Sequence, residues 1–194
     1  MNDDRPVFYY DFNSPYAWLA AERVNSVLPV PPVWQPVSFG HILQATGRTP
    51  WSFTDEKEAG IAEIERRAAE RGLPPPRWID GWPRATYSLL PLRAAVFAQQ
   101  AGRAVSFSLA AFRQLFAAGR TLAELDNVLI AAAASELHPR AVTKGIESRA
   151  VKDALREATD RALELGVVGI PTVAIGERLF WGDDRLEEAA ALLA

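Results

Sequence analysis

The first candidate for chemistry is a serine that lies directly before a proline at the expected start of a helix. Ser14 follows the β-branched and aromatic run from Val7 to Phe12, which predicts a buried strand, and Pro15 suits a first helical turn. A hydroxyl at that place lies among free N–H groups at the positive end of the helix dipole, which favours a carboxylate, a phosphate or a thiolate. Alternatively, Ser14 only caps the helix, which is the usual role of serine there.

Two further candidate segments lie late in the sequence. Ile170 and Pro171 precede a predicted strand, where a cis bond would turn backbone N–H and C=O groups toward a ligand, and a trans proline would only begin the strand. Asp183 and Asp184 begin the last predicted helix, where one carboxylate could bind a ligand ammonium group, or both could simply complement the helix dipole. Each segment is therefore a candidate binding site with a purely structural alternative.

Four aromatic residues surround a proline-rich loop over residues 73–83. They are Trp51, Trp78, Trp82 and Tyr87. Flat, rigid rings of this kind could wall a pocket for an aromatic substrate by stacking on it. The alternative is that they fix the long loop onto the core. In either case the loop is the best candidate for a hinge or a flap.

The composition excludes several kinds of chemistry. The 194 residues include no cysteine, which removes disulfides, thiolate nucleophiles, cysteine zinc sites and any dithiol redox cycle carried by the chain itself. Only two histidines are present, His41 and His138, so no metal site is expected. With 21 Lys and Arg against 24 Asp and Glu, the sequence has no electrostatic signature of a nucleic-acid partner. No apolar stretch approaches the about 18 residues of a membrane span, so we expect a soluble, cytoplasmic protein.

The elements that must position these residues predict an α/β fold. The sequence opens as strand–helix–strand, continues as a block of helices and returns to strands before a final helix. After the first strand and helix, the predicted elements are a strand over 33–37, helices over 55–71, 87–100, 106–118, 121–134 and 148–165, strands over 172–175 and 178–181, and a helix over 183–193. Thr121 and Glu124 are expected to form a capping box.

Taken together, these segments resemble the 2-hydroxychromene-2-carboxylate isomerase family, whose members are close relatives of kappa-class glutathione transferases within the thioredoxin-fold superfamily. The resemblance spans nearly the whole chain, and its first and last segments are the most specific. The segments that carry it are Tyr10–Tyr16, Gln35–Val37, Ala45–Gly47, Gly166–Thr172 and Leu179–Leu186.

The resemblance implies an architecture and an assembly. The fold would be thioredoxin-like with an inserted all-helical domain. Residues 1–45 and 148–194 would form the thioredoxin-like domain, and residues 46–147 the helical one. The resemblance also implies a homodimer, with glutathione bound between the two domains of a chain.

The resemblance further implies roles for the candidate residues. Ser14 matches the serine that hydrogen-bonds the glutathione sulfur. Ile170 and Pro171 match the cis-proline dipeptide whose backbone pairs with the cysteinyl part of glutathione. Asp184 matches the acid that meets the γ-glutamyl ammonium group, and Asp183 is its neighbour at the helix start. The missing cysteines are then explained, because glutathione supplies the sulfur.

The sequence departs from the family pattern at two places. Many relatives carry an Asn-Thr pair in the helix after the proline-rich loop, where Tyr87-Ser88 stands here. The glutathione-contacting lysine of the family has no clear match, and Lys57 is the candidate. These departures concern the substrate side more than the fold.

On this basis we expect a glutathione-dependent isomerase of an aromatic or chromene-type carboxylate. Ser14 would hold the thiolate while it adds to a conjugated carbon, the former double bond rotates, and the thiolate is expelled. Trp51, Trp78, Trp82 and Tyr87 are the candidates for the substrate wall. The alternatives are a kappa-like glutathione transferase or peroxidase, and a non-catalytic thioredoxin-like binding module.

Overall fold

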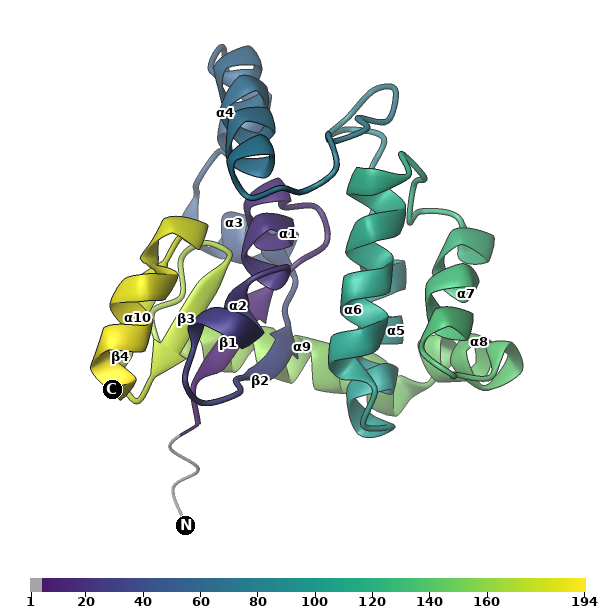
Figure 1. Cartoon of the computed structure of the whole chain (residues 1–194). Helices are drawn as coiled ribbons and strands as arrows, with labels where there is room; N and C mark the ends of the chain where they lie inside the picture. Colours follow the sequence, from purple (N-terminus) through teal and green to yellow (C-terminus); the bar gives the residue numbers. More distant parts are fainter. Residues whose placement is uncertain (1–4) are drawn as a thin grey trace.

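A four-stranded mixed sheet organises residues 5–194, which are the residues described by the computed structural model (Figure 1). Its strands are β1 (Val7–Tyr10), β2 (Val33–Pro36), β3 (Thr172–Ile175) and β4 (Arg178–Trp181), in the order β2-β1-β3-β4. β1 is parallel to β2 and antiparallel to β3, so Val7 pairs with Val33 on one side and with Ala174 on the other. The first four residues of the predicted domain over 1–45 lie outside the described residues.

Helices separate and follow these strands. They are α1 (Pro15–Ala21), α2 (Val24–Val27), α3 (Phe39–Thr46), α4 (Lys57–Glu70), α5 (Leu89–Gln100), α6 (Ala104–Phe112), α7 (Leu125–Ala134), α8 (Pro139–Glu147), α9 (Arg149–Glu164) and α10 (Leu186–Leu193). α10 packs on β3, β4 and α2, whereas α9 packs on β2 and α3. In Figure 1, α10 and α2 lie in front of the sheet and α9 passes behind it.

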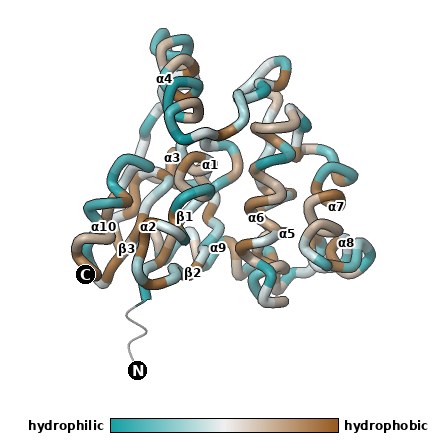
Figure 2. Tube along the Cα trace, viewed as in Figure 1, coloured by the Kyte–Doolittle hydropathy of each residue, from teal (hydrophilic) through white to brown (hydrophobic). Residues whose placement is uncertain are grey.

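The helices α5 to α8, which follow β2 and precede β3 in the sequence, form a block beside the sheet (Figure 1). α5 is its centre, because it packs against α6, α7, α8 and α9. α9 joins the two parts, since it contacts α5 and α8 as well as β2. α4 stands apart and alternates between hydrophilic and hydrophobic residues along its length (Figure 2), and only Ile64 and Ala68 of its side chains are buried.

One aromatic core connects the sheet to the helical block. The ring of Phe12 lies 4.9 Å from that of Phe112, and Trp18 stacks on Phe116 at 5.4 Å. The Tyr10 hydroxyl lies 2.6 Å from the buried hydroxyl of Ser108 in α6. Because burial of large aromatic side chains dominates core energetics, these contacts fix the block relative to the strand that leads to Ser14.

The structure corrects several predicted boundaries. α3 was not predicted, although Ser38 caps it by accepting a hydrogen bond from the His41 N–H group at 3.3 Å. The helix predicted over 106–118 changes after Phe112 into a single π turn. The predicted capping box does not form: α7 begins only after Glu124, whose side chain makes no capping bond. Thr121 instead accepts the Ala123 N–H group within the preceding turn at 3.2 Å.

Candidate functional site

Ser14 lies at the start of α1 beside the segment that leads into β3. Its Oγ accepts the backbone N–H of Ala17 at 3.2 Å, which confirms the predicted N-cap, and its hydroxyl points toward the Ile170 carbonyl at 3.5 Å. Ser14 is 5% exposed and lines a hollow of about 330 Å³, called here the serine hollow. A capping hydroxyl is therefore open to a small cavity at a helix start, where an anion is favoured.

The wall opposite Ser14 is formed by the segment before β3 and by the end of β4. The Ile170–Pro171 peptide bond is cis. The Pro171 carbonyl accepts the Gly182 N–H group at 2.9 Å, which ties this segment to the turn after β4. Trp181 lies against Gly169 so closely that a Cβ atom on Gly169 would be 2.5 Å from its indole ring. Glycine at 169 therefore makes room for an aromatic wall.

A second hollow, of about 260 Å³, continues from the serine hollow and shares Tyr16, Ile170 and Trp181 with it. The two aspartates predicted at the start of the last helix both line this second hollow, in different states. Asp184 is 60% exposed, and its carboxylate is 3.9 Å from Arg67. Asp184 is therefore the carboxylate that remains accessible to a ligand.

Asp183, by contrast, is buried and already forms ion pairs within the chain. It is 1% exposed and pairs with Arg67 at 2.6 Å and with Arg71 at 2.5 Å, both from α4. Removing one partner of such a buried pair leaves an uncompensated charge, which typically costs about 3–5 kcal/mol. Asp183 thus joins α4 to the segment that carries Asp184.

The four aromatic candidates are divided among three cavities. Trp51 and Trp82 line the serine hollow, with ring centroids 5.6 Å apart. Trp78 packs behind Trp82 at 4.7 Å, donates its Nε1–H to Glu65 at 3.0 Å and lines a separate hollow. Tyr87 lines a pocket on the other side of Asn13. The structure therefore brings two of the four residues to Ser14.

Sequence reasoning missed several residues of the serine hollow. Arg48 lines it, and its guanidinium carbon lies 4.4 Å from the ring centroid of Trp181. Lys57 does not line the hollow, and its ammonium group lies 6.0 Å from the Trp82 ring. Arg48 directly follows Gly47, whose φ of 65° ends α3, so it could be placed only once α3 had been recognised.

Another residue that sequence reasoning missed is Asp11, which does not line the hollow and is fully buried next to the Ser14 loop. One carboxylate oxygen accepts the Asn13 N–H at 2.9 Å, and the other accepts the Phe39 N–H at 2.8 Å and the Ser88 hydroxyl at 3.1 Å. Burial raises the pKa of Asp11 to about 6, although these hydrogen bonds oppose the rise. Asp11 therefore ties the Ser14 loop to the starts of α3 and α5.

The sequence predicts neither a metal site nor a membrane span, and the described residues bear on both expectations. Across residues 5–194, no group of three or more histidine, cysteine, aspartate or glutamate side chains is arranged to hold a metal ion. His41 lies 3.7 Å from Asp160, and His138 caps α8. In the same part of the chain, every helix is too short or too polar to cross a membrane.

Comparisons with known proteins agree with this architecture. The profile of the DSBA-like thioredoxin domain family matches residues 7–194. A 2-hydroxychromene-2-carboxylate isomerase from Sphingobium xenophagum is 26% identical over 191 residues, which is 93% of either chain. A solved 2-hydroxychromene-2-carboxylate isomerase superposes with a TM-score of 0.85 at 20% identity, covering 97% of this chain and 93% of the other.

A cytosolic disulfide reductase from Pseudomonas aeruginosa, solved with glutathione, also has this architecture. Its TM-score is 0.64 at 18% identity, over 97% of this chain and 96% of the other. At such identities the likeness concerns the fold. The fold is therefore thioredoxin-like with a helical insertion between β2 and β3, as predicted from the sequence.

Proposed function

The chain belongs to the family of DSBA-like thioredoxin domains, and from this premise we propose that it is a glutathione-dependent isomerase of an aromatic or chromene-type carboxylate. One observation carries the proposal: Ser14 lies at a helix start beside Ile170 and Pro171, in a chain that contains no cysteine. Thiol chemistry at this place needs a thiol from outside the chain, and a helix start favours the ionised form of that thiol. The isomerase relative, matched over 93% of the chain, supports isomerisation as the reaction.

Three groups suit the three parts of glutathione. Asp184 offers an accessible carboxylate for the γ-glutamyl ammonium group, and the backbone of Ile170 lies beside Ser14, where the cysteinyl part would bind. Arg48 offers a guanidinium for the glycyl carboxylate, in the place for which Lys57 was the candidate. These assignments leave Ser14 facing the sulfur.

Bound glutathione supplies a nucleophilic thiolate, which can add reversibly to a conjugated carbon so that the former double bond rotates. Ser14 holds the charge: its hydroxyl hydrogen, directed weakly at the Ile170 carbonyl 3.5 Å away, can turn to the sulfur. Trp51 and Trp82 exclude water from one side and offer ring faces to an aromatic substrate. Trp78 supports Trp82 from behind in this scheme.

The division of the chain belongs to the same proposal. We assign residues 1–45 and 148–194 to a thioredoxin-like domain and 46–147 to a helical domain, because α4 to α8 all lie in the second range. Residues of both ranges, Ser14 and Trp51 among them, line the serine hollow, so glutathione would bind where the domains meet. A homodimer is also proposed, and light scattering of the full chain in solution tests it.

Glutathione titration by calorimetry tests the cofactor. The chain should bind glutathione, and Asp184→Ala should weaken binding about tenfold, because an exposed charge-assisted hydrogen bond is lost. Glu188→Ala removes an acid from the first turn of α10, the helix that follows the 3-10 turn of Asp184, outside both hollows, and should leave the affinity unchanged. Absence of glutathione binding would refute the proposal and leave a non-catalytic binding module.

An activity comparison tests the reaction. The chain with glutathione should isomerise 2-hydroxychromene-2-carboxylate, and Ser14→Ala should slow the reaction without unfolding the chain. Conjugation of an electrophilic aryl halide, or reduction of a peroxide, without any isomerisation would identify a transferase or peroxidase on the same scaffold and would contradict the isomerase assignment.

A further inference from the structure

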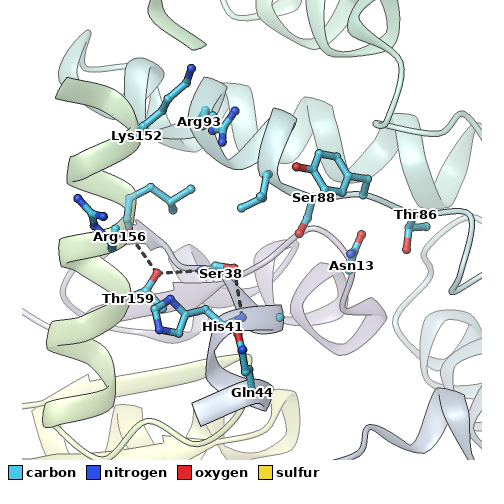
Figure 3. A pocket seen from close by; sticks show the side chains of 14 residues that line it. Asn13, Ser38, His41, Gln44, Thr86, Ser88, Arg93, Lys152, Arg156 and Thr159 are labelled. Atoms are coloured by element: carbon cyan, nitrogen blue, oxygen red, sulfur yellow. Dashed lines mark hydrogen bonds between the residues drawn. The ribbon is translucent and has the colours of Figure 1, made fainter. Parts of the chain in front are cut away.

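A basic pocket of about 510 Å³ lies between α3, α5 and α9 (Figure 3). Its basic lining residues are Arg93 from α5, Lys152 and Arg156 from α9, and His41 from α3. Within the described part of the chain, no aspartate or glutamate lines it. Three permanent positive charges without an acid in the wall make this cavity attractive to an anion.

The positive charges of this basic pocket are not equally available. Lys152 pairs with Glu147 at 2.9 Å and Arg156 with Asp153 at 2.7 Å, and neither acid lines the pocket. Arg93 is half-buried and has no ion-pair partner within 4.0 Å among residues 5–194. Lys152 and, more weakly, Arg93 lower the pKa of Glu147, so Arg93 interacts with this acid without pairing directly with it. A guanidinium partly removed from water gains most from a bidentate carboxylate, which Arg93 does not have.

Polar groups at two helix starts complete the wall. Ser38 caps α3, and Ser88 precedes α5, whose first residue Leu89 also lines the pocket. The Ser88 hydroxyl donates its hydrogen bond to Asp11, so α5 begins without a side-chain cap. The positive end of its dipole adds to the charge of Arg93 one turn later.

The basic pocket adjoins the serine hollow. Asn13, the neighbour of Ser14, lines both cavities. A further hollow of about 410 Å³ adjoins both: it shares Phe39 and Leu43 with the serine hollow and Thr86 with the basic pocket. From Ser14 the lining thus passes through this further hollow, which is lined by Phe39, Leu43 and Arg84, to the basic pocket around Arg93.

We propose that the basic pocket binds the carboxylate of the acceptor substrate, with Arg93 as its principal contact and with Lys152 and Arg156 as supporting charges. The aromatic body would lie against Phe39 and Leu43 while the reacting carbon faces Ser14. The site therefore selects aromatic carboxylates over neutral analogues of the same shape. This inference rests on the proposed function, because it takes Ser14 to mark the reacting end.

Binding of salicylate, compared with its neutral amide salicylamide, tests the inference on the full chain. Wild type should bind salicylate at least tenfold more tightly than salicylamide. Arg93→Gln should remove most of this preference, Arg93→Lys should keep part of it, and affinity for salicylamide should not change. Arg140→Gln, an equal loss of charge at an exposed position of α8 outside the pocket, is the matched control and should change neither affinity.

Glutathione titration of the same variants separates this inference from the proposed function. Arg93→Gln should bind glutathione as wild type does, which also shows that the variant is folded. Equal affinity for salicylate and salicylamide in a chain that binds glutathione would overturn the basic pocket alone. A preference that survives in both Arg93→Gln and Arg156→Gln would overturn it too, because the carboxylate must then bind elsewhere. Failure to bind glutathione would instead overturn the proposed function.

Discussion

Replacing Ser14 with alanine should raise the pKa of the bound glutathione thiol by about one to two units. The variant loses one hydrogen bond to a charged sulfur, and such bonds contribute about 1.5–3 kcal/mol, where 1.36 kcal/mol corresponds to one pKa unit. The backbone N–H groups at the start of α1 remain, so part of the thiolate stabilisation survives. The same change removes the cap on Ala17, which should lower the free energy of unfolding by about 0.5–2 kcal/mol.

Ser38→Ala is the matched control for this experiment. Ser38 caps α3 by accepting the His41 N–H at 3.3 Å, yet it does not line the serine hollow. Ultraviolet absorbance of the thiolate, followed against pH in glutathione-saturated protein, gives the pKa, and urea unfolding gives the stability. Both variants should lose similar stability, and only Ser14→Ala should shift the thiol. A thiol that titrates identically in wild type and Ser14→Ala would refute the reasoning.

Two further predictions concern Asp11 and Gly169. Burial raises the pKa of Asp11 from 3.8 to about 6. Between these two values the folded chain keeps the Asp11 proton, whereas the unfolded chain loses it. The contribution of Asp11 to the unfolding free energy should therefore fall by about 3 kcal/mol between about pH 4 and pH 6 and stay level above pH 6. Urea unfolding against pH should show that fall in wild type and not in Asp11→Asn, and equal slopes would contradict it. Gly169→Ala should displace Trp181 and weaken glutathione binding about tenfold in calorimetry, because overpacking typically costs about 1–3 kcal/mol. Gly145→Ala is the control: its Cβ would meet the Phe97 ring at 2.4 Å, outside both hollows, so it should lower stability and leave glutathione binding intact. Equal effects of the two glycine variants on glutathione binding would count against a role for Trp181.

The elements that were predicted well are those fixed by short-range signals. The hairpin of β3 and β4 has the predicted bounds because a β-branched run, a Gly176-Glu177 turn and a second run follow one another directly. The N-cap formed by Ser14 was likewise predictable from its immediate neighbours in the sequence. α3 was missed because its eight residues follow a strand without a charged or strongly periodic face, and the π turn after Phe112 has no clear sequence signal.

The site was predictable only where a motif lies within one segment. The residues around Ser14, around Pro171 and at Asp184 are of this kind, and the structure places them along two adjoining hollows. Trp78 could not be distinguished from Trp82 beforehand, since which ring faces a cavity depends on the path of the whole loop. Arg93 lies inside a predicted helix, and its place in a pocket with Lys152 and Arg156 becomes visible only when α9 is placed beside α5.

The pairing of β1 between β2 and β3 sets the order in which this protein can be completed during translation. β1 and β2 can meet once the first forty or so residues have left the ribosome, but the other edge of β1 has no neighbour until β3 is synthesised. The hydroxyl of Ser14 likewise waits for Ile170. The inserted helices therefore emerge while the sheet still has an open edge, and a nascent chain held at that stage would carry a strand free to pair with another chain.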